Sequence, residues 1–242
     1  MLQHIPAPLG RALADKRAGH GALTINQPAF ARVPDDLGLL VLSRGNNGLL
    51  DARHTNDGVG ASPPLGWTGV PAEARSLALI VEDADSPTRE PIVHAIAYNI
   101  PAQSGQLVEG ALGDDAGPAT GRNSYGKLGW LPPDPPSGHG THAYVFQLFA
   151  LDTMLEFASP PSRAQLVAAM EGRVIAKGRS SADFVRVPER GPGAATFMLA
   201  GAGLAVAALA VTAARRRAGG ATPETDPAES PPATPVHGQT ET

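Results

Sequence analysis

Residues 121–144 read GRNSYGKLGWLPPDPPSGHGTHAY: a glycine-rich turn, then a proline-rich segment, then the start of an apolar strand. Glycines let the backbone point N–H groups into a concavity, which suits a bound anion, and the prolines stiffen the segment that follows. His142 and Tyr144 are two residues apart on the strand, so their side chains should point the same way, about 7 Å apart. The pattern predicts either one wall of an anion recess or a purely structural proline-rich loop.

Two other polar clusters accompany apolar strands. Residues 82–87 (EDADSP) directly follow an apolar run, where acidic side chains either line a pocket rim or form a solvated turn. Residues 93–101 read VHAIAYNIP, and side-chain alternation predicts that His94, Ile96 and Tyr98 share one face. A single histidine on such a face is either a site residue or a core residue, so neither cluster identifies a function by itself.

The chain as a whole is typical of a mainly-β protein. Its 242 residues include 28 Gly and 24 Pro, a balance that favours a loop-rich β domain over a helical bundle. One helix is expected after Ser162, which forms a capping box with Gln165, and Gly172 is the expected stop. The strands are predicted in apolar or alternating runs bounded by turn residues, at 37–42, 76–81, 93–100, 143–151, 174–177 and 184–187.

Composition argues against several classes of function. The net charge is −4, and residues 1–190 hold 16 basic and 19 acidic side chains without a basic stripe, which argues against a nucleic-acid partner. The chain has no cysteine and therefore no disulfide or thiolate chemistry. Neither a His-Glu-x-x-His pair nor a Gly-x-Ser-x-Gly elbow occurs. We therefore expect no catalytic residue, no metal ligand and no cofactor, with a metal-dependent hydrolase as the least favoured alternative.

In this order, the motifs resemble those of the phosphatidylethanolamine-binding protein family, in its bacterial, Raf-kinase-inhibitor-like branch. Residues 57–67, which end in SPPLGW, resemble its early signature, and residues 83–87 resemble its Asp-Pro-Asp-x-Pro motif. Residues 94–101 are similar to its His-Trp…Tyr-Asn-Ile-Pro strand. Residues 121–144 resemble its glycine-rich stretch and His-Arg-Tyr strand, and residues 169–174 its closing helix and strand. The resemblance covers roughly residues 20–187.

The resemblance implies an antiparallel Greek-key β-sandwich with a few peripheral helices and a small surface cavity for a phosphate-like or carboxylate group. The ligand-binding residues implied by motif match, of which Asp85 and Pro133 shape the rim, are Asp83, Asp85, His94, Gly129, Pro133, His142 and Tyr144. The sequence departs from the family pattern at Ala84, Ala95 and Ala143, and it has Pro132-Pro133 where a Gly-Pro pair is usual. Ala95 and Ala143 are expected to point away from the histidines and to alter packing more than the pocket.

The expected function is that of a non-enzymatic binding protein with a pocket for a small anion or a phospholipid headgroup. A regulatory role is one form of this hypothesis. The alternative is a protein-binding inhibitor of a kinase or protease, because the family contains such regulators. Asp83 would repel an anion unless it orients a histidine or is protonated. A carboxylate beside His94 should favour the imidazolium form, so anion affinity is expected to rise as the pH falls from about 8 to 6.

A membrane anchor is also expected. Residues 194–214 are 21 residues without a charge, followed by three arginines, and a helix of that length spans about 31 Å. The competing interpretation is an alanine-rich buried or surface helix. A single pass with a cytoplasmic main domain is slightly favoured, because no signal peptide is recognisable, although the arginines favour the reverse. The predicted segments are an arm at 1–22, a ligand-binding domain at 23–188, a linker at 189–193, the membrane helix at 194–214, and a basic cluster with a disordered tail at 215–242.

Overall fold

The structure, a computed structural model, describes residues 5–45, 47–113 and 117–186. Within these ranges the strands are β1 (Gly38–Val41), β2 (Leu65–Thr68), β3 (Ser76–Asp83), β4 (Ile92–Pro101), β5 (Gly105–Leu107), β6 (Ala119–Thr120), β7 (Thr141–Leu151) and β8 (Val174–Val185). The α-helices are α1 (Ala7–Ala12) and α2 (Arg163–Met170). Short 3-10 turns are η2 (His20–Ala22), η3 (Thr24–Asn26), η4 (Pro28–Phe30) and η5 (Ala52–His54).

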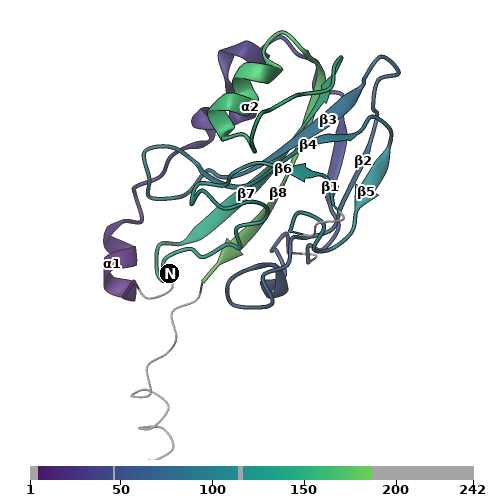
Figure 1. The fold of residues 1–242 in the computed structure, drawn as a ribbon. Helices are drawn as coiled ribbons and strands as arrows, with labels where there is room; N and C mark the ends of the chain where they lie inside the picture. Colours follow the sequence, from purple (N-terminus) through teal and green to yellow (C-terminus); the bar gives the residue numbers. More distant parts are fainter. Residues whose placement is uncertain (1–4, 46, 114–116, 187–242) are drawn as a thin grey trace, which may run out of the picture. The chain divides into compact units, whose positions relative to one another are not determined.

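The strands form two antiparallel sheets (Figure 1). The larger sheet has the strand order β6-β4-β3-β7-β8, and the smaller one has the order β1-β2-β5. β3 lies at the centre of the larger sheet, and all eight of its residues are buried. Its uninterrupted apolar run suits a strand that is covered on both faces. The mainly-β prediction is therefore supported, with β1, β3, β4 and β7 at four of the six predicted strands.

The two faces of β3 belong to separate cores because its side chains alternate. Leu77, Leu79 and Val81 pack with the smaller sheet in one core. Ala78 and Ile80 face the other way and pack with α2 and with the 3-10 turns. Figure 1 shows α2 and these turns at one side of the larger sheet and β1, β2 and β5 at the other. The larger sheet is therefore a middle layer, covered on both faces.

Helix α2 forms where its capping signals predict it. The Ser162 side chain accepts a hydrogen bond from the Gln165 backbone N–H, and the Ser162 N–H donates to Gln165 Oε1 at 2.9 Å. Leu166 and Met170 are fully buried on its inner face. Gly172, with φ of +71°, follows the end of the helix in the left-handed conformation that favours glycine. The helix prediction is confirmed in its capping box and its stop.

A β-bulge interrupts the pairing of β4 with β3. The register pairs Val81 with Ala95 but Glu82 with Val93, so His94 is an extra residue on β4. Such a bulge bends the strand and changes the direction of a side chain, and bulges are common beside functional sites. The normal alternation of β4 is therefore broken at His94.

The bulge puts His94 on the side of the smaller sheet. Its ring lies 5.0 Å from the ring of Tyr144, which belongs to the core between the sheets together with Ala95. Ile96 and Tyr98 instead pack in the core beneath α2. The prediction that these two residues share a face with His94 is therefore wrong. The prediction that Ala95 points away from His94 is wrong for the same reason.

β8 is one continuous strand, although the sequence predicts two separate strands at 174–177 and 184–187. The polar stretch 178–183 between them pairs with β7 along its whole length. Tertiary pairing therefore overrides the weak strand propensity of this stretch. Gly178 is required there, because a Cβ at this position would collide with the backbone carbonyl of Leu37.

The prediction of a membrane anchor needs a correction. No helix within residues 5–45, 47–113 and 117–186 is long and apolar enough to cross a bilayer. The predicted span at 194–214, with its flanking linker and tail, lies outside the described residues. The prediction of a single-pass, membrane-anchored protein is therefore corrected to a mainly-β fold whose described residues contain no transmembrane helix.

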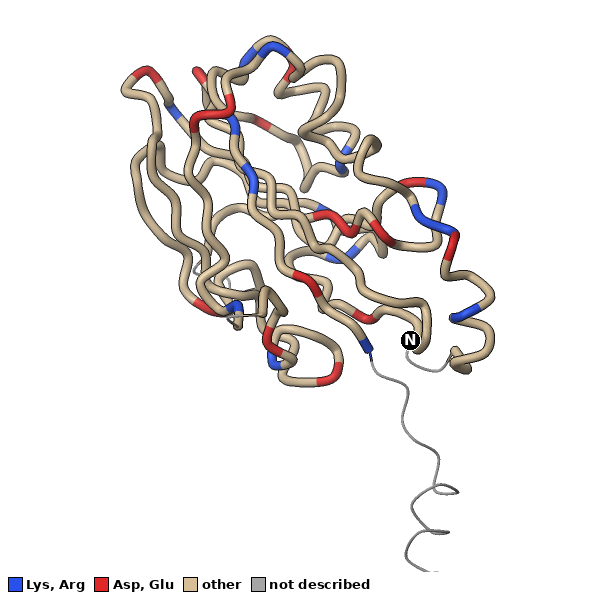
Figure 2. The backbone as a smooth tube through the Cα atoms, turned by 180° about the vertical axis from the view of Figure 1, so that it is seen from behind, with Lys and Arg blue, Asp and Glu red and all other residues tan. Residues whose placement is uncertain are grey.

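Charged residues are dispersed over the backbone. Figure 2, which views the molecule from behind, shows Lys and Arg positions interspersed with Asp and Glu positions. In that view the described residues present no continuous basic stripe of the kind that follows a nucleic-acid backbone.

Candidate functional site

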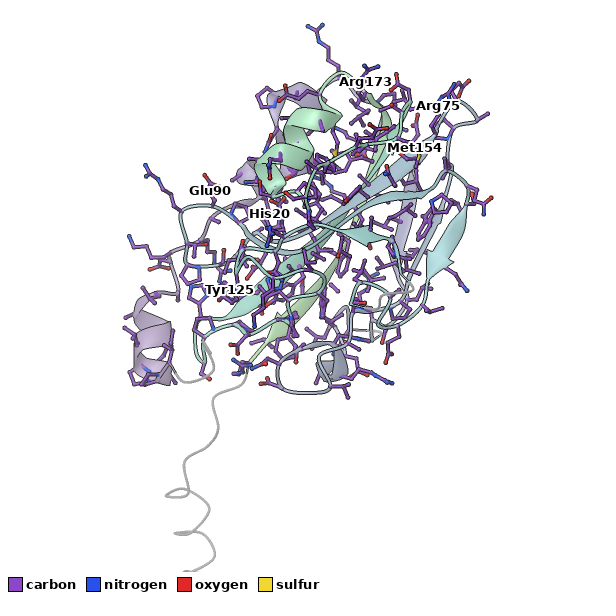
Figure 3. All side chains as sticks on the ribbon, viewed as in Figure 1. His20, Arg75, Glu90, Tyr125, Met154 and Arg173 are labelled. Atoms are coloured by element: carbon purple, nitrogen blue, oxygen red, sulfur yellow. The ribbon has the colours of Figure 1, made fainter. Side chains whose placement is uncertain are left out.

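A recess of about 230 Å³ lies where β3 ends and where β4 and β7 begin. Asp83 comes from β3, His94 from β4, and His142 and Tyr144 from β7. These are four of the seven residues predicted from the sequence, brought together by the antiparallel pairing of β3 with both neighbours. Tyr125, labelled in Figure 3, is an exposed residue of the loop after β6. The other lining residues are Asn56, Ser86, Pro87, Ile92, Tyr125, Lys127, Leu131, Pro132, Asp134 and Pro135.

His94 and Tyr144 each carry a buried polar atom without a hydrogen-bond partner among the described residues. These atoms are His94 Nε2 and the Tyr144 hydroxyl oxygen. His94 Nδ1 lies 2.6 Å from the carbonyl oxygen of Leu131. A carbonyl only accepts, so Nδ1 carries the hydrogen, and the neutral ring has a free lone pair at Nε2. Leaving a buried polar group unpaired costs about 1–3 kcal/mol, so two in one recess mark a site where a ligand can form hydrogen bonds.

Asp83 and His142 form a buried pair at the inner side of the recess. His142 Nδ1 lies 2.8 Å from Asp83 Oδ2, and the other carboxylate oxygen accepts the Asp85 backbone N–H at 2.9 Å. The opposite ring nitrogen, His142 Nε2, lies 2.8 Å from His139 Nδ1. Asp83 therefore orients a histidine, one of the two roles considered for it from the sequence.

The other three predicted site residues lie outside the recess lining. Asp85 accepts the Ala143 backbone N–H at 2.8 Å and forms a 2.6 Å ion pair with Arg17. Gly129 has a φ of +74°, and a Cβ there would collide with the Leu112 carbonyl oxygen, so its role is in the turn. Pro133 is buried, and its carbonyl oxygen accepts the Asn56 N–H at 2.9 Å. These residues support the walls without touching the recess.

Comparison with known proteins gives consistent matches. A family model described as phosphatidylethanolamine-binding protein matches residues 43–185. A UPF0098 protein of Methanothermobacter thermautotrophicus is 42% identical over 139 residues, which cover 55% of this chain and 89% of the relative. Two solved structures, the homologue CT736 from Chlamydia trachomatis and YbcL from E. coli, have TM-scores of 0.57 at 32% and 28% identity. They cover 63% and 62% of this chain, and each match spans 99% of the neighbour.

The chain belongs to the phosphatidylethanolamine-binding protein family. The motif resemblance seen in the sequence is thus confirmed for the family. The matched segment contains all seven predicted site residues, but it excludes the arm before residue 43 and Arg186 after β8. Both excluded parts contact the walls of the recess.

Arg186 is one residue that sequence reasoning missed. Its guanidinium donates to both carboxylate oxygens of Asp57 at 3.1 Å, to Asp134 at 2.7 Å and to the Pro135 carbonyl at 2.7 Å. Burial opposes its charge, but the two carboxylates outweigh burial and raise its pKa. Because Asp134 and Pro135 line the recess, Arg186 holds the proline-rich wall of this family member in place. No motif around it could have shown this, because its partners are distant in sequence.

Burial dominates the electrostatics of the recess. It lowers the pKa of His94, although the Asp83 charge and the Leu131 carbonyl act in the opposite direction. The expectation that Asp83 favours an imidazolium at His94 is therefore corrected, because desolvation is the larger effect. Burial, assisted by Asp83, raises the pKa of the Tyr144 hydroxyl well above 10, so this group stays protonated.

Proposed function

We propose that this protein is a non-enzymatic binding protein whose recess holds the phosphate group of a small ligand, either a phosphate monoester or a phospholipid headgroup. The two buried atoms without a described partner, His94 Nε2 and the Tyr144 hydroxyl, carry the proposal. A ligand that supplies their missing hydrogen bonds recovers the cost of burying them. Membership in a family named for phosphatidylethanolamine binding agrees with this ligand class.

The two groups suit a phosphate that carries one proton. The Tyr144 O–H donates to a phosphate oxygen, since its raised pKa keeps it neutral. Neutral His94 accepts the P–OH hydrogen of the monoanion at Nε2. If the dianion enters instead, His94 takes up a proton and donates it. In both cases the complex holds one proton that is shared between the imidazole and the phosphate. The second pKa of a phosphate monoester is about 6.

The size of the recess favours a headgroup over a whole lipid. Its 230 Å³ is smaller than the roughly 300–1,000 Å³ of pockets that enclose drug-sized ligands. Lys127, an exposed residue of the lining, adds a cation for a phosphate dianion. A phosphate can therefore lie in the recess while the remainder of the ligand extends past Tyr125.

The carboxylate of the recess is engaged by the protein, which makes it a poor general base for a substrate. Asp83 uses one oxygen for His142 and the other for the Asp85 N–H. Within the described residues, no group of three or more His, Cys, Asp or Glu side chains is arranged to hold a metal ion. The polar atoms left for a ligand are thus suited to hydrogen bonding.

The proposal is tested by titrating the full chain with phenyl phosphate in a calorimeter. His94→Asn is the informative variant, because asparagine Nδ2 can still donate to the Leu131 carbonyl while the atom at the Nε2 position is deleted. We expect at least a tenfold loss of affinity, whereas the matched control His20→Asn, at an exposed histidine (Figure 3), binds like the original chain. Equal affinities for both variants would overturn the proposed site.

The two sources of phosphate are separated by a second titration. Glycerophosphoethanolamine presents the diester of a lipid headgroup, which carries one charge and no P–OH. Preference for phenyl phosphate supports a monoester ligand, and preference for the diester supports a lipid headgroup. If neither compound binds while benzoate does, the phosphate assignment is refuted in favour of a carboxylate.

A further inference from the structure

A chain of hydrogen bonds runs from the N-terminal arm to the acidic motif. His139 Nε2 lies 3.2 Å from the Lys16 carbonyl oxygen, His139 Nδ1 lies 2.8 Å from His142 Nε2, and His142 Nδ1 lies 2.8 Å from Asp83 Oδ2. Both histidines are 1% exposed and Asp83 is 4% exposed. Bulk water therefore does not compete for these contacts.

The chain fixes a number of protons. The Lys16 carbonyl can only accept, so His139 Nε2 carries a hydrogen, and each of the other two contacts also needs one hydrogen. Three hydrogens are therefore required. Two neutral histidines and a carboxylate hold only two between them, so the chain holds one more. With that extra proton, the unit of His139, His142 and Asp83 has a net charge of zero.

We propose that His139 is a positioning residue, which keeps His142 protonated at both ring nitrogens so that the acidic motif presents no net negative charge to the recess. Its Nδ1 lone pair, fixed by the carbonyl on the other side of the ring, is the acceptor for the His142 Nε2 hydrogen. The consequence for phosphate binding rests on the proposed function. It explains how a phosphate enters a recess that contains Asp83.

The surroundings place the extra proton on His142. Burial and the neighbouring His142 lower the pKa of His139, against the opposite effect of the Lys16 and Leu13 carbonyls. His142 has the Asp83 carboxylate as its direct partner, whereas the hydrogen-bond partners of His139 among the described residues are His142 and backbone carbonyls. The titratable and charged groups around the pair are Asp83 and Asp85 at the end of β3, His94 on β4, Tyr144 on β7, Arg17 on the arm, and Lys127, Asp134 and Arg186 at the outer wall.

The arm holds the Lys16 carbonyl in place. Arg17 forms an ion pair with Asp85 and donates to the Thr141 carbonyl at 3.0 Å. The backbone N–H groups of the next two residues, 18 and 19, donate to the carbonyls of Ser86 and Ala84 at 3.0 and 2.8 Å. The acceptor that orients His139 is therefore attached to the acidic motif itself. A segment outside the family-matched residues thereby acts on the recess.

The proton count is tested directly by ¹⁵N NMR of histidine side chains in the full chain at pH 7.5. We expect both ring nitrogens of His142 to carry a proton, and one nitrogen of His139 to carry none. In His139→Phe, which removes the acceptor, His142 should lose its Nε2 proton. In His139→Gln, whose amide offers one acceptor and one donor, His142 should keep its Nε2 proton. A neutral His142 in the unaltered chain, or a doubly protonated one in His139→Phe, would overturn the inference.

Phosphate binding gives a second readout. At pH 7.5 we expect phenyl phosphate to bind His139→Phe about tenfold more weakly than the original chain, with recovery at pH 6, and His139→Gln within about threefold. An equal loss at both pH values would indicate a structural role only and would contradict the inference. If the original chain shows the doubly protonated His142 but binds no phosphate, the proposed function fails while the assignment of His139 stands.

Discussion

Tyr144→Phe should weaken phosphate binding without weakening the fold. The substitution removes one oxygen from a fully buried ring whose hydroxyl has no hydrogen-bond partner among the described residues. A hydrogen bond to a charged group contributes about 1.5–3 kcal/mol, so the dissociation constant for phenyl phosphate should rise roughly 10- to 150-fold. The free energy of unfolding should stay unchanged or rise, by up to about 1–3 kcal/mol, because a buried unpaired hydroxyl is removed.

The two effects are measured on the same preparations by calorimetric titration and thermal unfolding. A gain of 1 kcal/mol corresponds to roughly 2–4 °C in Tm for a domain of this size. Tyr98→Phe is the matched control, because that ring packs on Phe157 in the other core, with centroids 5.1 Å apart. It should leave affinity unchanged. Normal phosphate affinity in Tyr144→Phe, or a marked loss of stability, would refute the account of this hydroxyl as an unpaired donor for a ligand.

Two predictions concern pH. The complex holds a proton that neutral His94 and a phosphate dianion lack. The affinity for phenyl phosphate should therefore fall as the pH rises above about 6, by up to tenfold per pH unit. Titrations between pH 6 and 8 check this, and a flat profile would contradict it. Burial lowers the pKa of folded His94, so below about pH 6.5 the unfolded chain binds a proton that the folded chain does not. The free energy of unfolding should then drop by up to about 1.4 kcal/mol per unit as the pH falls, as measured in urea, and His94→Asn should reduce this slope; an unchanged slope in that variant would refute the assignment.

Helix α2 and the strands β1, β3, β4 and β7 could be predicted from the sequence because their signals are local, whereas β2, β5 and β6 were not predicted. The capping box of Ser162 and Gln165, and the apolar run of β3, depend on neighbours within a few residues. The resemblance of the motifs to the family also predicted that Asp83, His94, His142 and Tyr144 lie together, and all four line the recess. The single strand β8 was missed because its polar middle is held by pairing with β7, which composition does not encode.

The details of the site could not be predicted, because they depend on long-range contacts. The bulge at His94 arises from a mismatch of register between β3 and β4, which alternation along one strand cannot indicate. His139 acquires its role from a carbonyl 123 residues away in sequence. The electrostatic expectation for His94 was wrong in sign because a sequence names the neighbouring carboxylate but does not give the depth of burial. Desolvation is the larger effect there.

The charge of the recess depends on residues outside the family-matched segment, 43–185. Arg17 pairs with Asp85 at 2.6 Å, and Arg186 pairs with Asp134 at 2.7 Å. Without these two cations, Asp85, which supports a wall, and Asp134, which lines the recess, would be unopposed. Negative charge around the recess would then repel a phosphate. On the proposed function, ligand preference therefore does not depend on the family motifs alone. The arm and the residue after β8 would offset the charge of the acidic walls, so that Tyr144 and His94 can act as hydrogen-bonding groups for the proposed anion.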